Sequence, residues 1–160
     1  MNESCGLPGS APTWRDPDVI HRLLTTPATW AVVGLSANRA RTAHRIAGFL
    51  RSRLDMALVP VHPRAEEAYG STGYARLADI PSPDEPGAPG PIAVVDYFVN
   101  SSRVGPLVDE AIAEADRLGI TALWLQVGVV DEAAATRARE AGLDVVMDTC
   151  PAIEAPRLSR

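Results

Sequence analysis

The sequence predicts an α/β domain with a doubly wound, mainly parallel sheet and helices on both faces. Two observations support this fold class. Runs such as Trp30–Leu35 are apolar at both alternating positions, as expected for strands that are covered on both faces. Segments with helical spacing of apolar residues separate these runs, and alternating strands and helices favour a parallel sheet. At 160 residues, the chain is long enough for one hydrophobic core but not for two independent ones.

The first half of the chain predicts a short helix and then a βαβ unit. Asp16 is the expected cap of the first helix, Pro17 takes its first position, and the helix should end near Pro27. The strand 30–35 is followed by a helix and then by the strand 56–61, a span typical of a right-handed crossover. The apolar stripe of that helix consists of Ala43, Ile46, Ala47, Leu50 and Leu54.

The second half continues the alternation of strands and helices. Residues 81–91 contain five prolines and predict a solvated, semi-rigid loop. After this loop we expect a strand at 92–99, a helix at 107–118 stopped by Gly119, a strand at 122–127, a helix capped by Asp131 and ended by Gly142, and a strand at 144–147. The expected division is a flexible leader at 1–15, one domain at 16–156 and a tail at 157–160.

Composition excludes several classes of function. The net charge of −5 argues against general nucleic-acid binding, and no apolar run is long enough to cross a bilayer. All 15 basic residues are arginines, so a Schiff-base lysine and the phosphate-binding lysine of a P-loop are both excluded. The spacing of the cysteines and histidines predicts no metal site. The N-terminal segment does not resemble a secretory signal, and we therefore expect the cytoplasm.

The loop after the first strand predicts a phosphate site. In an open parallel sheet, ligands bind beyond the carboxyl ends of the strands, and a helix N-terminus stabilises an anion. The loop residues expected to contribute are Gly34, Ser36, Asn38, Arg39, Arg41 and Thr42. The loop is not the dinucleotide fingerprint GxGxxG, because Gly34 has no glycine two residues later. Ser36 lacks the setting of a nucleophile elbow and is expected to hydrogen-bond within the loop.

The end of the second predicted strand argues against NAD. A strand that selects NAD usually ends in an Asp or Glu, which holds the ribose hydroxyls. This chain has Pro60-Val61-His62-Pro63-Arg64 instead, and Arg64 would favour a phosphorylated ribose. The ligands that fit are coenzyme A, which carries a 3′-phosphate, and NADP as the weaker candidate. His62 either contacts this phosphate or caps the turn.

Four segments of the chain resemble the small stand-alone CoA-binding proteins, which are similar to the CoA-binding domain of the succinyl-CoA synthetase α chain. The segments are 31–36, 60–63, 123–130 and 142–151, and the likeness covers about residues 18–155. It implies a Rossmann-like fold, with Gln126 near the site. Three positions depart from the family pattern: Thr42 follows Arg41 and would replace a serine hydroxyl, His62 replaces an asparagine, and Thr149 stands where arginine is common.

For several side chains, the sequence leaves two interpretations open. Gln126 either contacts the ligand or bonds neighbouring loop backbone, and Cys150 either forms a mixed disulfide with the CoA thiol or is a buried apolar residue. Tyr69 and Tyr74 either cover the ligand or pack their own loop. Asp148 and Glu154 are either a carboxylate pair or loop and helix-capping residues. Trp124 is expected in the core.

The function that the sequence predicts is binding of coenzyme A or an acyl-CoA by a carrier or sensor protein. The adenosine end would lie near 61–64, and the pantetheine arm would run toward Asn100, Gln126 and Cys150. No catalytic set of residues converges on one point, so an enzyme is disfavoured. An NAD(P)-dependent oxidoreductase or redox sensor and a scaffold without a ligand remain alternatives. The sequence does not decide whether the chain forms a homodimer, and no nucleic-acid or membrane partner is expected.

Overall fold

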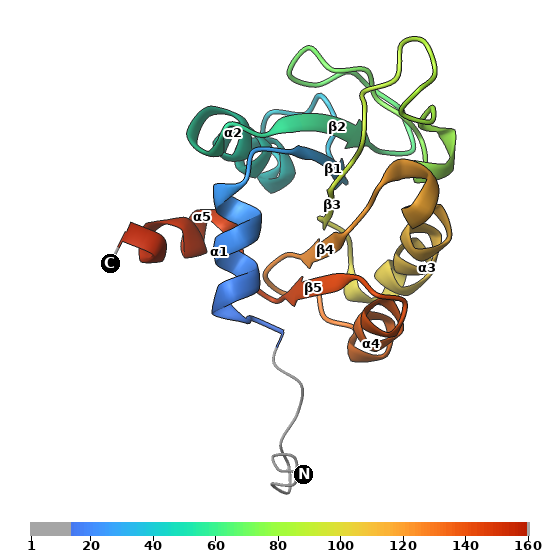
Figure 1. Cartoon of the computed structure of the whole chain (residues 1–160). Helices are drawn as coiled ribbons and strands as arrows, with labels where there is room; N and C mark the ends of the chain where they lie inside the picture. Colours follow the sequence, from blue (N-terminus) through green and yellow to red (C-terminus); the bar gives the residue numbers. More distant parts are fainter. Residues whose placement is uncertain (1–13, 160) are drawn as a thin grey trace, which may run out of the picture.

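The structure, a computed structural model, describes residues 14–159 and contains one five-stranded sheet (Figure 1). All neighbouring strands are parallel, in the order β2-β1-β3-β4-β5. The strands are β1 (Thr29–Val33), β2 (Ala57–Val61), β3 (Val94–Tyr97), β4 (Ala122–Leu125) and β5 (Asp144–Met147). The chain leaves β1 toward β2 on one side and returns to β3 on the other. The carboxyl ends of β1 and β3 therefore form the switch point at which such sheets bind ligands.

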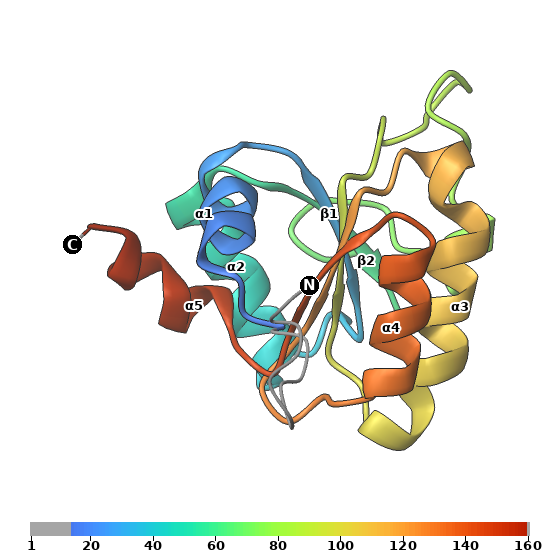
Figure 2. The same ribbon diagram turned by 60° about the horizontal axis from the view of Figure 1, so that its bottom comes forward.

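Helices cover both faces of the sheet (Figure 2). Helices α1 (Pro17–Thr25), α2 (Thr42–Leu54) and α5 (Pro151–Glu154) lie on one face, and α3 (Ser101–Leu118) and α4 (Glu132–Glu140) lie on the other. Two short 3₁₀ helices are formed by Leu77–Asp79 and Ala155–Ser159. Each face has its own apolar cluster, and the predicted doubly wound α/β fold is confirmed.

Local signals in the sequence placed three of the helix ends correctly. Asp16 accepts a hydrogen bond from the backbone N–H of Asp18, with Pro17 at the first helical position. Asp131 caps α4 in the same way, through the backbone N–H of Ala134. Gly119 ends α3 in the left-handed conformation, with φ of 85°. These caps satisfy backbone groups that would otherwise lack partners at the helix ends.

Helix α3 begins earlier than the sequence predicted. The apolar periodicity indicated a helix from Leu107, but the structure extends it back to Ser101, with Pro106 inside it. Asn100 is the N-cap, and its side-chain oxygen accepts a hydrogen bond from the backbone N–H of Ser102. Pro106 has no backbone N–H, so the helix lacks one hydrogen bond near its start. The cap at Asn100 stabilises the helix start in spite of this loss. This extension moves Arg103 from a loop into the first turn of a helix.

The first described residues contact the domain. The predicted leader 1–15 lies outside the described residues except for Trp14 and Arg15. The Trp14 carbonyl accepts a hydrogen bond from the Met147 backbone N–H, and the Arg139 guanidinium lies over the indole ring. The loop 81–91 is anchored beside its start, where Arg117 donates to the Ile80 carbonyl and to Ser82. Within 14–159, no helix has the length and apolar character needed to cross a bilayer.

Candidate functional site

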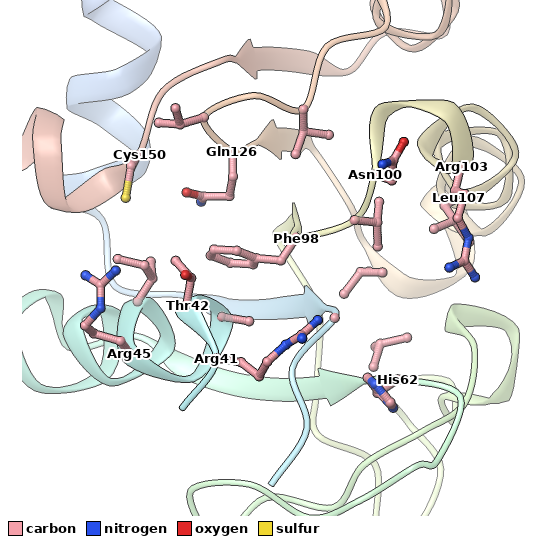
Figure 3. Close-up of a pocket in the computed structure, with 18 of the residues that line it drawn as sticks. Arg41, Thr42, Arg45, His62, Phe98, Asn100, Arg103, Leu107, Gln126 and Cys150 are labelled. Atoms are coloured by element: carbon pink, nitrogen blue, oxygen red, sulfur yellow. The ribbon is translucent and has the colours of Figure 1, made fainter. Parts of the chain in front are cut away.

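A cavity of about 1040 Å³ lies at the carboxyl ends of the strands, between the starts of α2, α3 and α5 (Figure 3). Most of the predicted site residues meet there, although they come from five separate segments. Those that line the cavity are Gly34, Arg41, Thr42, His62, Asn100, Gln126 and Cys150. The predicted residues Ser36, Asn38, Arg39 and Arg64 do not line it. The topology therefore brings Gly34 and the end of the β1 loop to the cavity, but not residues 35–39.

The first half of the β1 loop is held by its own hydrogen bonds. The Ser36 hydroxyl accepts from the backbone N–H of Asn38, and the Asn38 side chain accepts from that of Ala40. The Ala37 N–H donates to the Glu66 carboxylate, which comes from the segment after β2. Ser36 is thus a loop hydrogen-bonding residue, as the sequence indicated. The backbone N–H groups of Ala37 and Asn38 are therefore already bonded within the protein, and these bonds fix the conformation of the loop.

The N-terminus of α2 is the part of this loop that remains open. Its N-cap is Arg41, which makes no capping hydrogen bond, and its first turn contains no acidic residue. Thr42 and Ala43 line the cavity, and within residues 14–159 no protein group accepts from their backbone N–H groups. A 13-residue helix therefore directs free donors and the positive end of its dipole at the cavity. This arrangement can bind an anion.

Arginine side chains surround the same space. Arg41, Arg45 and Arg103 line the cavity, and among the described residues none of them forms an ion pair. In Figure 3, Arg41 and Arg103 lie on the side of His62, while Arg45 lies on the side of Cys150. The cavity also contains Glu110, whose carboxylate already accepts a hydrogen bond from the Ala78 backbone. Three unpaired guanidinium groups therefore favour an anionic ligand.

Two predicted phosphate ligands, Arg39 and Arg64, do not line the cavity. Arg39 is exposed and lies outside the cavity lining. Arg64 lies 3.9 Å from the Glu66 carboxylate and is also outside the lining. The sequence argument overlooked Glu66, which stands only two residues beyond Arg64. In place of these arginines, the structure puts Arg103 and Arg76 at the cavity.

His62 caps the turn after β2, one of the two roles that the sequence left open, and it also lines the cavity. Its ring Nδ1 accepts a hydrogen bond of 3.2 Å from the Arg64 backbone N–H, which caps the turn after β2. Because Nδ1 acts as an acceptor, the hydrogen of the neutral ring lies on Nε2. His62 also lines the cavity and therefore remains available to donate to an oxygen there. The two tyrosines do not line the cavity: Tyr69 donates to the His44 carbonyl in α2, and Tyr74 packs against the core.

The Gln126 side chain lines the cavity and bonds a neighbouring strand, not the loop backbone that was one of its two expected partners. Its side-chain Nε2 donates to Asp96 Oδ1 at 2.7 Å, and Asp96 is fully buried in the middle of the sheet. The second oxygen of Asp96 has no hydrogen-bond partner among the described residues. Burial raises the pKa of Asp96 to about 8, although the hydrogen bond from Gln126 lowers it in part. Asp96 is therefore a neutral carboxylic acid at pH 7.

Cys150 lies at the other end of the cavity from His62 (Figure 3). It is 7% exposed and precedes α5 as the N-cap. Burial raises the pKa of the Cys150 thiol, and the Asp96 carboxyl adds to the effect. The backbone on either side is fixed, because the buried Trp124 indole donates to the Thr149 carbonyl at 2.9 Å. The arrangement holds a thiol at a defined place and keeps it protonated.

The two acidic residues near Cys150 do not form a carboxylate pair. Glu154 accepts a hydrogen bond from the Thr149 hydroxyl, and Asp148 accepts one from the Gly128 backbone N–H. Among residues 14–159, no group of three or more His, Cys, Asp or Glu side chains is arranged to hold a metal ion. The site therefore relies on arginines, backbone donors and neutral polar groups.

Comparisons with known proteins identify a family and several similar chains. The family described as "CoA binding domain" matches residues 28–156. An uncharacterised protein of Bacillus subtilis, YneT, is 32% identical over 131 residues, which cover 82% of this chain and 87% of that protein. The structure of Prb, a redesigned PH1109 protein, is 30% identical and superposes with a TM-score of 0.76 over 92% of this chain and 94% of its own.

A Thermus thermophilus protein, cell-free ID.343, is 28% identical, with a TM-score of 0.73 over 89% of this chain and 98% of that chain. The match to the CoA-binding family covers most of the sequence and includes every strand described above. The chain therefore belongs to the CoA-binding domain family.

Proposed function

We propose that this protein binds coenzyme A, with the diphosphate at the N-terminus of α2. The observation that carries the proposal is the open start of that helix, where the backbone N–H groups of Thr42 and Ala43 face the cavity without protein acceptors. Arg41 and Arg45 flank these donors and form no ion pairs among the described residues. A diphosphate would supply the missing negative charge.

The adenosine end of the ligand would lie on the side of the cavity that contains His62 and Arg103. Both side chains line the cavity, and His62 Nε2 is a free donor. A phosphate on the ribose would find a cation in Arg103, a role that the sequence had assigned to Arg64. The pantetheine arm would cross the ends of β3 and β4 toward Gln126 and Cys150, where the lining is neutral apart from Arg45.

The same features support binding rather than catalysis. Cys150 is a poor nucleophile because burial raises its pKa and leaves little thiolate at neutral pH. Arg41, Arg45 and Arg103 act as fixed charges and do not exchange protons near pH 7. We therefore propose a cytoplasmic carrier or sensor of coenzyme A.

Titration calorimetry with four ligands tests this proposal. Coenzyme A should bind more tightly than 3′-dephospho-CoA, because the latter lacks the phosphate that Arg103 would hold. NADP and NAD should bind more weakly than coenzyme A. Tighter binding of NAD than of coenzyme A would favour the oxidoreductase alternative. Absence of binding by all four ligands at millimolar concentration would favour a scaffold that has lost its ligand.

A further inference from the structure

Asp96 and Gln126 form a buried, hydrogen-bonded pair beneath the cavity. One atom of this pair, the amide oxygen of Gln126, has no hydrogen-bond donor among the described residues. Gln126 Nε2 donates to Asp96 Oδ1 at 2.7 Å. Among the described residues, no donor contacts the other amide atom, Oε1, while Gln126 itself lines the cavity. Figure 3 shows the carboxamide reaching from the end of β4 into the space between Cys150 and Phe98.

The orientation of this amide is set by Asp96. In the structure the amide nitrogen faces Asp96 Oδ1 and donates to it at 2.7 Å, as it must when Oδ1 carries no proton. The carboxylate enforces this orientation, and the carboxylic acid keeps it with its proton on the unpartnered Oδ2. Asp96 is anchored in β3, where its register partners are Val32 and Trp124.

We propose that Asp96 is a positioning residue that makes Gln126 present its carbonyl oxygen to the cavity, so that this end of the site selects a free thiol over a thioester. The inference rests on the proposed function and adds to it the chemical state of the ligand. An amide oxygen accepts from an S–H or N–H group. A thioester carbonyl also offers only acceptor atoms, and it would meet Gln126 Oε1 without a proton between them.

The surroundings of the pair support this assignment. Cys150 lies at the same end of the cavity, and Arg45 acts electrostatically on its thiol. No charged group contributes to the raised pKa of Asp96, which is caused by burial alone and opposed by hydrogen bonds from Gln126 and the Tyr97 backbone. Arg45 is the cation at this end, but its guanidinium, as drawn in Figure 3, lies on the Cys150 side and away from Gln126.

The test compares ligands of equal bulk. S-ethyl-CoA and acetyl-CoA have sulfur substituents of similar size, but only acetyl-CoA carries the thioester oxygen. In calorimetry at pH 7, acetyl-CoA should bind at least about fivefold more weakly than S-ethyl-CoA, the lower end of the range expected for one unsatisfied neutral acceptor. Coenzyme A with its free thiol should bind at least as tightly as S-ethyl-CoA.

Two variants separate positioning from a general structural effect. Asp96→Ala removes the acceptor that holds the amide, and Gln126→Leu removes the amide while keeping an apolar side chain of similar length. Each variant should bind coenzyme A. In each, the ratio of the dissociation constant of acetyl-CoA to that of S-ethyl-CoA should fall toward one. Circular dichroism and thermal unfolding establish that each variant is folded, and either variant alone suffices for the comparison.

The outcomes distinguish this inference from the proposed function. If coenzyme A binds but the wild-type protein does not discriminate between S-ethyl-CoA and acetyl-CoA, the inference is wrong and the proposed function stands. Discrimination that persists in folded Asp96→Ala and Gln126→Leu variants also contradicts the inference, because the selectivity would then arise elsewhere. If no CoA derivative binds, the proposed function itself fails.

Discussion

Gly34 faces the backbone of Phe98 so closely that a Cβ atom at position 34 would lie 2.5 Å from the Phe98 carbonyl oxygen. Gly34 also has φ of 104°, which L side chains rarely adopt. The chain makes this turn directly after β1, where it leads into the loop toward α2. The glycine therefore allows the ends of β1 and β3 to approach each other at the floor of the cavity.

Gly34→Ala should lower the free energy of unfolding by at least about 2 kcal/mol, because the strain of a positive φ is added to a backbone clash. Gly142→Ala is the matched control, since Gly142 has φ of 93° and a Cβ there would meet nothing within 4 Å. The control should lose only about 1 kcal/mol. Urea denaturation measures both values, and equal losses would show that the contact with Phe98 can relax.

Asp96 makes the stability of the fold depend on pH. Its pKa is about 8 in the folded protein and 3.8 when unperturbed, so between these values the folded state binds one more proton than the unfolded state. The free energy of unfolding should therefore fall as the pH rises through this window, by up to about 1.4 kcal/mol per pH unit from this group. The contribution is fully present below pH 4 and is lost as the pH passes 8.

The matched variant for this prediction is Asp96→Asn, which cannot ionise. The free energy of unfolding of the wild type should decrease relative to that of the variant as the pH rises from 5 to 8. Above pH 8 the difference between the two proteins should stay constant. Urea denaturation at a series of pH values provides the measurement. A difference that is constant with pH would mean that Asp96 is already ionised in the folded protein.

Arg41→Ala should weaken coenzyme A binding by about 1.5 to 3 kcal/mol, the range for a lost hydrogen bond to a charged group. This corresponds to roughly a tenfold to hundredfold rise in the dissociation constant. Arg39→Ala is the control, because Arg39 lies in the same loop but does not line the cavity. Calorimetry on both variants should separate them, and equal effects would contradict the location of the phosphate site.

Cys150 should react with CoA disulfide, but slowly. In this exchange the Cys150 thiolate attacks one sulfur, forms the mixed disulfide and releases the other half as coenzyme A. Burial raises the pKa of Cys150, so the rate should increase with pH up to and beyond pH 9. Intact mass of a Cys5→Ser variant follows the adduct. Additional replacement by Cys150→Ser should abolish it, and an adduct that persisted would have to be noncovalent.

Local patterns were sufficient to predict most of the fold. Apolar runs identified the strands, and Asp16 and Asp131 located two helix starts, because capping depends on residues close in sequence. The start of α3 was missed, because the cap at Asn100 lies seven residues before Leu107, the first apolar residue of the predicted stripe. Arg103 was overlooked as a cavity residue for the same reason.

The predicted site was less complete, because its contacts join distant parts of the chain. Asp96 was missed: it is the single acid inside an apolar run, but its bond to Gln126 spans 30 positions and has no local signature. Arg64 forms an ion pair with Glu66, and Glu66 also accepts a hydrogen bond from the β1 loop. These contacts depend on how the segment after β2 folds back to that loop. The sequence predicted a site at the edge of the sheet where the cavity lies, and it assigned the ribose phosphate to an arginine that lies outside the cavity lining.

A crystal structure of the protein grown with coenzyme A tests the central claim most directly. The account predicts diphosphate oxygens within hydrogen-bond distance of the Thr42 and Ala43 backbone nitrogens, with the sulfur at the Gln126 end. A ligand whose diphosphate lay away from the start of α2, or a cavity closed by the protein's own side chains, would contradict it.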